Sequence, residues 1–185
     1  MADLEILTVQ NLEHLKILRT KSRKVQAVSP KMAAFAEQML DKMRDSNGVG
    51  LAAPQVGVLQ RLFVVEIPED EENDQPVETY IMFNPEIIKG RGEQVGYEGC
   101  LSIPGYRGEV ARRDQVTVKG LDVKGKPVRL KAEGYLARVF QHEIDHLDGI
   151  LYTDRMTDPD TFQPVEEGQE EAAELAAAEL EAATS

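Results

Sequence analysis

The chain has 185 residues, 42% of them hydrophobic, which suits one compact domain with its own core and argues against two full domains. Its formal net charge of −12 argues against nonspecific binding to nucleic acid, although much of the acidity follows Arg155, after which there is no Lys or Arg. A single cysteine excludes an internal disulfide bond and leaves one thiol free for chemistry.

No apolar run approaches the roughly 18 residues needed to cross a bilayer. The first residues, MADLEILTVQ, carry acidic side chains where a secretory signal would carry basic ones. We therefore expect a cytoplasmic protein with no membrane attachment.

The first strong helix signal begins at Ser29, a good N-cap residue. Pro30 suits the first helical position because an N–H group there would have no partner in the helix. Apolar residues recur at helical spacing as far as Met43, and Asn47-Gly48 favours the end of the helix. The pattern predicts an amphipathic helix near the N-terminus, with its methionines in the core.

The middle of the chain is typical of strands. The segments RLFVVEI (61–67), TYIMF (79–83) and QVTVKGLDV (115–123) are rich in β-branched or aromatic residues. The turn KGKP (124–127) predicts a hairpin between the last of them and VRLKA (128–132). These segments indicate a set of antiparallel or mixed strands.

A second helix is expected from Gly134 to Leu147, ended by Gly149. The sequence thus predicts an α+β fold in which antiparallel or mixed strands pack around this central helix. Residues 1–156 would form the main domain, and residues 157–185 an acidic tail rich in Ala and Glu.

The stretch QHEIDHLDG (141–149) carries the candidate chemistry. His142 and His146 are four residues apart and would share one face of the second helix, with Glu143 between them. This spacing is the metalloprotease signature, in which two imidazoles bind the metal and the glutamate acts as a base. Catalytic sites of this kind use three protein ligands and one water, so one ligand is still missing.

Candidates for the third ligand lie on both sides of this helix. Downstream, Tyr152 stands where metzincins have their third histidine, and a tail glutamate would lack packed partners to hold it. His14 lies in a polar segment and suits a surface or capping role. Upstream, Cys100 follows a glycine and precedes strand-like residues at 101–104. One thiolate and two neutral imidazoles would leave a divalent ion one position for water.

Three motifs together, GVGLAAPQVG (48–57), EGCLS (98–102) and QHEIDH (141–146), resemble those of peptide deformylases, in the same order and at similar separations. The likeness covers about residues 1–155. It implies a metal-dependent hydrolase that removes the formyl group from N-formylmethionine of newly synthesised polypeptides and releases formate. Residues 1–156 would then be the catalytic domain.

By this resemblance Cys100, His142 and His146 bind one divalent ion, which is commonly Fe²⁺ in bacterial members, with Zn²⁺, Ni²⁺ or Co²⁺ as the other candidates. Glu143 would take the proton of the attacking water and later deliver one to the departing amine, without binding the metal.

The resemblance also implies an oxyanion site made by the side-chain amide of Gln55 and the backbone N–H of Leu101. The substrate would lie like an added strand against backbone groups near Val49, Gly50 and Gly99.

The resemblance further assigns Val49 and Val139, with the methylene groups of Arg138, to the pocket for the methionine side chain. Ordinary core packing is the alternative for both valines. Arg107 stands where family members have an arginine near the substrate backbone, and a solvated surface charge is the alternative for it.

The implied partners are formylated nascent polypeptides, which suggests transient proximity to the ribosome. The acidic tail differs from the basic C-terminal helix by which some bacterial members touch the ribosome, so no direct nucleic-acid contact is predicted. Two other interpretations stay open: a zinc endopeptidase, which needs a ligand after His146, and a noncatalytic structural metal site, which needs four protein ligands.

Overall fold

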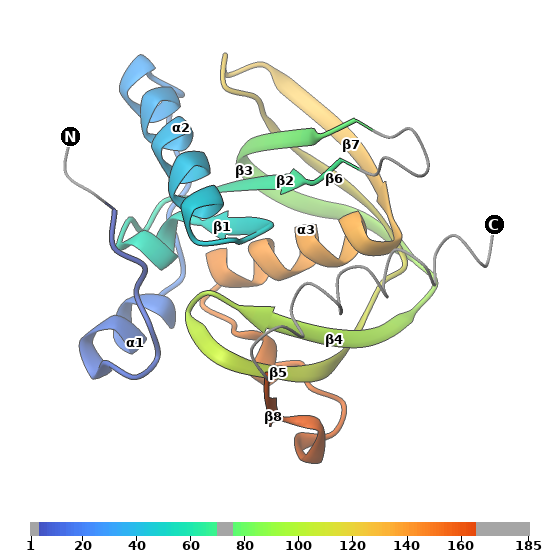
Figure 1. The fold of residues 1–185 in the computed structure, drawn as a ribbon. Helices are drawn as coiled ribbons and strands as arrows, with labels where there is room; N and C mark the ends of the chain where they lie inside the picture. Colours follow the sequence, from blue (N-terminus) through green and yellow to red (C-terminus); the bar gives the residue numbers. More distant parts are fainter. Residues whose placement is uncertain (1–3, 70–75, 166–185) are drawn as a thin grey trace.

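The computed structural model describes residues 4–69 and 76–165 (Figure 1). Its α-helices are α1 (Leu12–Leu18), α2 (Pro30–Asp45) and α3 (Gly134–Leu147), and its short 3-10 helices are η1 (Ala53–Val56), η2 (Tyr152–Asp154) and η3 (Pro159–Thr161). The strands are β1 (Gly50–Ala52), β2 (Leu62–Ile67), β3 (Glu78–Arg91), β4 (Gln94–Cys100), β5 (Ile103–Arg112), β6 (Gln115–Leu121), β7 (Pro127–Glu133) and β8 (Gln163–Pro164). Within these ranges no helix is long and apolar enough to cross a membrane.

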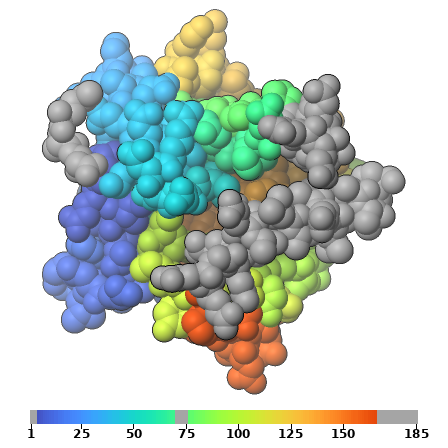
Figure 2. Space-filling model, viewed as in Figure 1, coloured from blue at the N-terminus to red at the C-terminus, as the bar shows by residue number. Residues whose placement is uncertain are grey.

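The strands form two antiparallel sheets, one in the order β1-β2-β3-β6-β7 and the other in the order β4-β5-β8. Helix α3 runs between them, and the space-filling view shows parts of it recessed between β1–β3 and β4–β5 (Figures 1 and 2). Its apolar side packs on the inner face of the larger sheet in one buried cluster that includes Phe63, Val118, Phe140, Ile144 and Leu147. The predicted α+β class is confirmed.

Helix α2 covers the opposite face of the same sheet at its β1–β2–β3 end. Phe63 and Val65 of β2 pack toward α3, whereas Val64 between them packs toward α2, as the two-residue alternation of a strand requires. The Ser29 hydroxyl accepts the backbone N–H of Met32 at 3.3 Å, and the helix begins at Pro30. The expected start of this helix is therefore confirmed, and its methionines Met39 and Met43 are buried core residues.

Several elements match the sequence-based prediction closely, whereas others were not predicted. Strands β2, β6 and β7 lie where the β-branched segments predicted them, and α3 has the expected bounds. The β4–β5 hairpin and α1 were not predicted, and the strand expected at 101–104 begins only at Ile103 because Leu101 and Ser102 form a turn.

Part of the expected tail packs on the smaller sheet. Strand β8 pairs with β5, with Tyr106 opposite Pro164, and the ring of Tyr106 stacks on Phe162 at 4.8 Å between centroids. Residues 157–165 were expected in the tail, whereas in the structure they lie against the main domain. The rest of the tail, 166–185, and residues 1–3 and 70–75 are outside the described residues.

Candidate metal centre

Three potential metal ligands meet where the end of β4 approaches α3. His142 and His146 extend from one face of α3, and Cys100 is the last residue of β4. Cys100 Sγ lies 3.2 Å from His146 Nε2, which lies 3.2 Å from His142 Nε2. The three ligand atoms lie within 4.8 Å of one another, and they are the one such group in residues 4–69 and 76–165.

The chemistry of this donor set fits a divalent transition metal. A soft thiolate with two imidazoles is the donor set of catalytic zinc and related ions, with one position left for water. Burial holds the pKa of His146 well below its usual range, so that ring is neutral, as a ligand must be. For His142 burial lowers the pKa, but contacts with Cys100 and Glu98 raise it by more, so that a proton would compete with a metal ion for this ring.

Glu98, two residues before Cys100 on β4, orients one of these rings. Residues two apart on a strand face the same side, so Glu98 also points toward α3, where its Oε2 lies 2.8 Å from His142 Nδ1. A carboxylate on Nδ1 leaves Nε2 free for the metal and fixes the ring. Glu98 belongs to the EGCLS motif but was not expected to act at the site; its two-residue spacing from Cys100 was the available signal.

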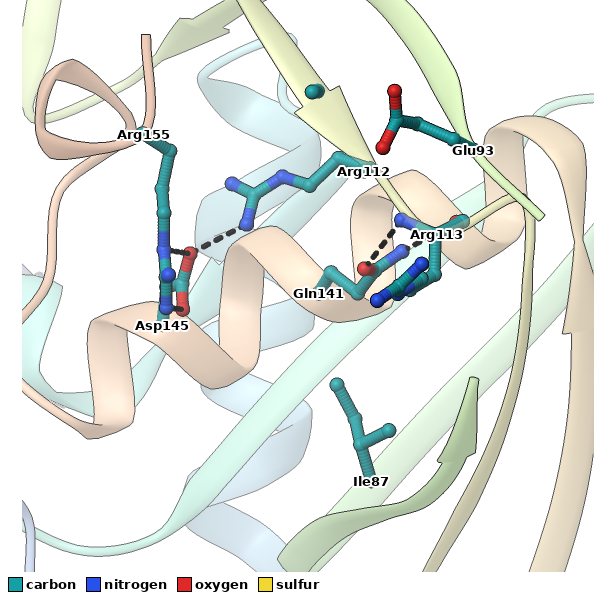
Figure 3. A pocket seen from close by; sticks show the side chains of 8 residues that line it. Ile87, Glu93, Arg112, Arg113, Gln141, Asp145 and Arg155 are labelled. Carbon is teal, nitrogen blue, oxygen red and sulfur yellow. Dashed lines mark hydrogen bonds and ion pairs between the residues drawn. The ribbon is translucent and has the colours of Figure 1, made fainter. Parts of the chain in front are cut away.

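Glu98 is buried with an arginine on each side. Arg112 donates to both of its oxygens at 2.8 and 2.9 Å, and Arg138 donates to Oε1 at 2.9 Å. Burial alone would raise the pKa of Glu98, but the hydrogen bonds from Arg112 and His142 hold it well below its usual range. Arg112 also binds Asp145, which Arg155 binds at 3.0 Å, beside a pocket of about 340 Å³ (Figure 3). The charge network thus ties β4 and β5 to α3.

Glu143 turns from the same helix into a tight, buried space. Its side chain is almost inaccessible, and its Oε2 has no hydrogen-bond partner in the described structure. Burial raises the pKa of Glu143 to about 7. A methyl group at Gly50 would lie only 2.3 Å from its Oε1, so glycine at position 50 makes room for this carboxylate.

Gln55 is fixed with its amide nitrogen toward the cysteine. The backbone N–H of Ala52 donates to Oε1 at 2.8 Å, so Nε2 points the other way, 3.1 Å from Ser102 Oγ and 3.5 Å from Cys100 Sγ. Ser102 is fully buried, and its backbone N–H lies 3.4 Å from the same sulfur. Ser102 is thus a second site residue that was not predicted from the sequence.

The other expected site residues lie on elements around this centre. Leu101 follows Cys100 and packs against the α2 side of the core, whereas Val49 and the buried Val139 pack in the core cluster of α3. Gly99 precedes Cys100 on β4 and is paired with Arg107 of β5.

The two candidate arginines differ in environment. The Arg107 guanidinium lies over the ring of Tyr97, 5.0 Å from its centroid. Arg138 is buried and takes part in the Glu98 network, where it also donates to the carbonyl of Val110 at 3.1 Å.

The family model described as polypeptide deformylase matches residues 4–162 of the chain. The peptide deformylase of Thermomicrobium roseum is 51% identical over 161 residues, which cover 86% of this chain and 91% of that protein. The peptide deformylase of Symbiobacterium thermophilum is 48% identical over 180 residues, covering 97% and 77%.

Solved structures of the same family resemble the whole fold. The Thermotoga maritima peptide deformylase has a TM-score of 0.76 at 34% identity and covers 85% of this chain and 100% of its own. The Acinetobacter baumannii peptide deformylase with bound Met-Ala-Ser has a TM-score of 0.74 at 36% identity, covering 84% and 99%.

Proposed function

The chain belongs to the polypeptide deformylase family and is a hydrolase that removes the N-formyl group from new polypeptides, and we propose that Cys100, His142 and His146 hold its metal ion. The observation that carries this proposal is the convergence of the three donor atoms within 4.8 Å beside the buried Glu143. We propose Fe²⁺ as the native ion, with Zn²⁺, Ni²⁺ or Co²⁺ as substitutes.

A divalent ion held there would supply Lewis acidity and make water a nucleophile at neutral pH. Glu143 does not take part in binding the ion. Its carboxylate accepts the proton of the attacking water and returns a proton to the amine as the formyl C–N bond breaks, which yields formate and a free N-terminus. The pKa of about 7 suits a group that must both accept and donate a proton near neutrality.

The developing charge on the formyl oxygen needs donors that are already in place. Gln55 Nε2 is held toward Cys100 by the hydrogen bond from Ala52 to the other end of the amide. Together with the backbone N–H of Leu101 it would stabilise the oxyanion, and loss of one such donor typically costs about 3 kcal/mol.

The substrate peptide would lie as an added strand between the two sheets. In the described part of the chain β1 pairs only with β2, and β4 only with β5, so each presents an edge near the donors. Backbone groups of Val49, Gly50 and Gly99 lie on or next to these edges, and Val49 and Val139 would line the methionine pocket. Met-Ala-Ser, bound to the similar Acinetobacter baumannii protein, is the peptide that deformylation of formyl-Met-Ala-Ser would leave.

Arg107 lies on β5, one strand behind the β4 edge. Its position opposite Gly99 puts it on the neighbouring strand, where its guanidinium is engaged by Tyr97. We propose that Arg107 contacts the backbone of the substrate. We also propose that the enzyme acts in the cytoplasm, on nascent polypeptides near the ribosome.

Formate release from formyl-Met-Ala-Ser by protein loaded with Fe²⁺ under anaerobic conditions tests the assignment, with bound metal measured in the same sample. Cys100→Ala should lose both metal and activity, whereas the control His14→Ala, which changes a histidine outside the donor group, should keep both. Full metal content in Cys100→Ala would exclude this ligand set.

A further inference from the structure

The outer face of β3, β6 and β7 carries a two-dimensional array of cations. The strand register places Glu86, Lys119 and Arg129 in one row across the three strands. The next row is Lys89, Thr117 and Lys131, and the third is Arg91, Gln115 and Glu133. Five of these nine positions are basic and two are acidic; we call the nine residues the basic face.

The basic face is the solvent side of the sheet. Val116 and Val118 alternate with Gln115, Thr117 and Lys119 on β6, and both valines are buried in the cluster around α3. The residues between them therefore point away from α3. Helix α2 and the apolar cluster beneath it extend on this side of the sheet as far as Phe83 of β3 and Leu121 of β6, the pair next to the Glu86–Lys119 row, and all five cations are exposed.

Intramolecular contacts do not account for these charges. Lys119 pairs with Glu86 at 3.2 Å, but in residues 4–69 and 76–165 no ion pair is formed by the other four, Lys89, Arg91, Arg129 and Lys131. Lys119 and Arg129 are directly opposite each other on neighbouring strands, an arrangement that destabilises a sheet. Stability therefore does not explain the array.

The negative net charge of the whole chain does not describe the charge near this face. Fourteen of the 33 acids lie in two segments, five between residues 69 and 74 and nine after Arg155, and the remaining 19 are fewer than the 21 Lys and Arg. Nonspecific attraction depends on the local field within about 8–10 Å at physiological salt, rather than on the sum over the chain.

We propose that the basic face binds the phosphate backbone of double-helical RNA. Neighbouring positions within a row are about 4.8 Å apart, and successive rows along the strands are about 7 Å apart. Several phosphates of a duplex can therefore contact the basic face at once. None of its nine positions is aromatic, and single-stranded RNA is usually held by stacking of bases on aromatic rings. The enzyme acts on new polypeptides, which are made on a particle rich in RNA helices, so such a face would keep it close to its substrate.

Binding to a labelled RNA duplex of arbitrary sequence, measured by fluorescence anisotropy between about 25 and 200 mM salt, tests the proposal. The full chain should bind, and each cation that contacts a phosphate contributes about 0.9 to the slope of log affinity against log salt. Arg129→Gln/Lys131→Gln should therefore lower that slope by about 2. The matched control Lys16→Gln/Lys21→Gln removes two exposed charges in and just after α1 and should leave the slope unchanged.

Formate release separates this inference from the proposed function, because the basic face lies on the far side of the sheet from α3. Both double variants should deformylate formyl-Met-Ala-Ser at the wild-type rate, which also reports that they fold. Three results would overturn the inference: no duplex binding at 25 mM salt, equal loss of slope in the control pair, or tighter binding to single-stranded RNA or to anionic lipid vesicles than to the duplex.

Discussion

At the scale of single residues, the tightest contact in the site is the one between the backbone of Gly50 and the side chain of Glu143. A Cβ atom at position 50 would come 2.3 Å from Glu143 Oε1 and 2.8 Å from the carboxyl carbon, so Gly50→Ala must displace the Glu143 carboxylate. We expect Gly50→Ala to lower kcat by about 100-fold or more while bound metal stays at the wild-type level. Steady-state formate release and metal analysis measure the two quantities.

Gly99→Ala is the matched control for that variant. The added methyl group at position 99 would meet only the carbonyl oxygen of Tyr106, at an ordinary 3.6 Å. Its kcat should fall much less than that of Gly50→Ala, because the added methyl group creates no clash. If both alanines lowered kcat equally, backbone contact with the substrate, rather than room for Glu143, would explain the effect at position 50.

Glu143 itself gives the second prediction at this scale. Glu143→Gln keeps the size and burial of the side chain but can no longer accept a proton, so kcat should fall by about 10²- to 10⁴-fold. Because the three donor atoms are unchanged, metal content should stay at the wild-type level. Formate release and metal analysis on the same samples check this, and loss of the metal would assign Glu143 to the ligand set.

The residues of the site could be predicted from sequence to unequal extents. His142, Glu143 and His146 are readable because the helical period alone brings them together. Cys100 and Gln55 required the comparison of motifs, since their approach to α3 depends on the packing of distant elements. Glu98, Arg112 and Ser102 act through contacts across the two sheets and α3. The two-residue spacing of Glu98 from Cys100 is a sequence signal for one of these contacts, whereas the spacing of Arg112 along the chain indicates none of them.

At the scale of elements, Glu98 joins β4 to α3 through His142 and to β5 through Arg112. Glu98→Gln should weaken metal affinity about 10- to 100-fold, the usual effect of losing the partner of a metal-binding histidine. It also leaves two buried arginines without their shared carboxylate, which should cost about 3–5 kcal/mol of stability.

Competition with a chelator, on protein shown to be folded, measures the affinity. Glu109→Gln is the control, because Glu109 lies on β5 and accepts a hydrogen bond from Thr157 at 3.0 Å, with no contact to a metal ligand. Equal affinities of Glu98→Gln and wild type would mean that His142 is oriented by its surroundings without this carboxylate.

A second contact between elements ties α2 to β2. Arg44 donates to both oxygens of Glu66, and this holds the pKa of Glu66 below its ordinary value of 4.5. A lowered pKa contributes stability that is fully present above the unfolded value and is lost as pH falls through the folded value. The difference in unfolding free energy between wild type and Arg44→Gln should therefore shrink as pH falls below about 4.5.

Urea denaturation of both proteins from pH 7 to pH 3 checks the sign. Carboxylates other than Glu66 and Asp41, the two that pair with Arg44, titrate in both proteins and cancel in the difference. A difference that stayed constant or grew toward pH 3 would show that Arg44 stabilises the fold by packing of its side chain rather than through Glu66.

The elements themselves were predictable where one face is apolar and regular. Helices α2 and α3 and strands β6 and β7 each bury one periodic face, and β2 is a short apolar run buried on both faces, so sequence pattern determines them. The β4–β5 hairpin escapes the same approach because four of its residues are glycine and its inner face is charged: Glu98 and Arg112 neutralise each other only after the strands pair.

At the scale of the whole molecule, the donors come from elements that are far apart along the chain and belong to different layers. Cys100 is on the smaller sheet, and His142 and His146 are on the helix that packs against the larger one. A metal ion held by all three would bind the folded protein and not the unfolded chain, so it should stabilise the packing of the two layers.

Addition of metal to chelator-treated protein should therefore raise the temperature of unfolding. At about 100 times the dissociation constant the gain is about 2.7 kcal/mol. For a chain of this size that corresponds to about 5–10 °C, measurable by circular dichroism. Cys100→Ala keeps both histidines on α3 but no donor on β4, so the same metal should raise its unfolding temperature much less. An equal rise in the two proteins would mean that the ion is held by α3 alone, and the link between the layers would then depend on the Glu98 network.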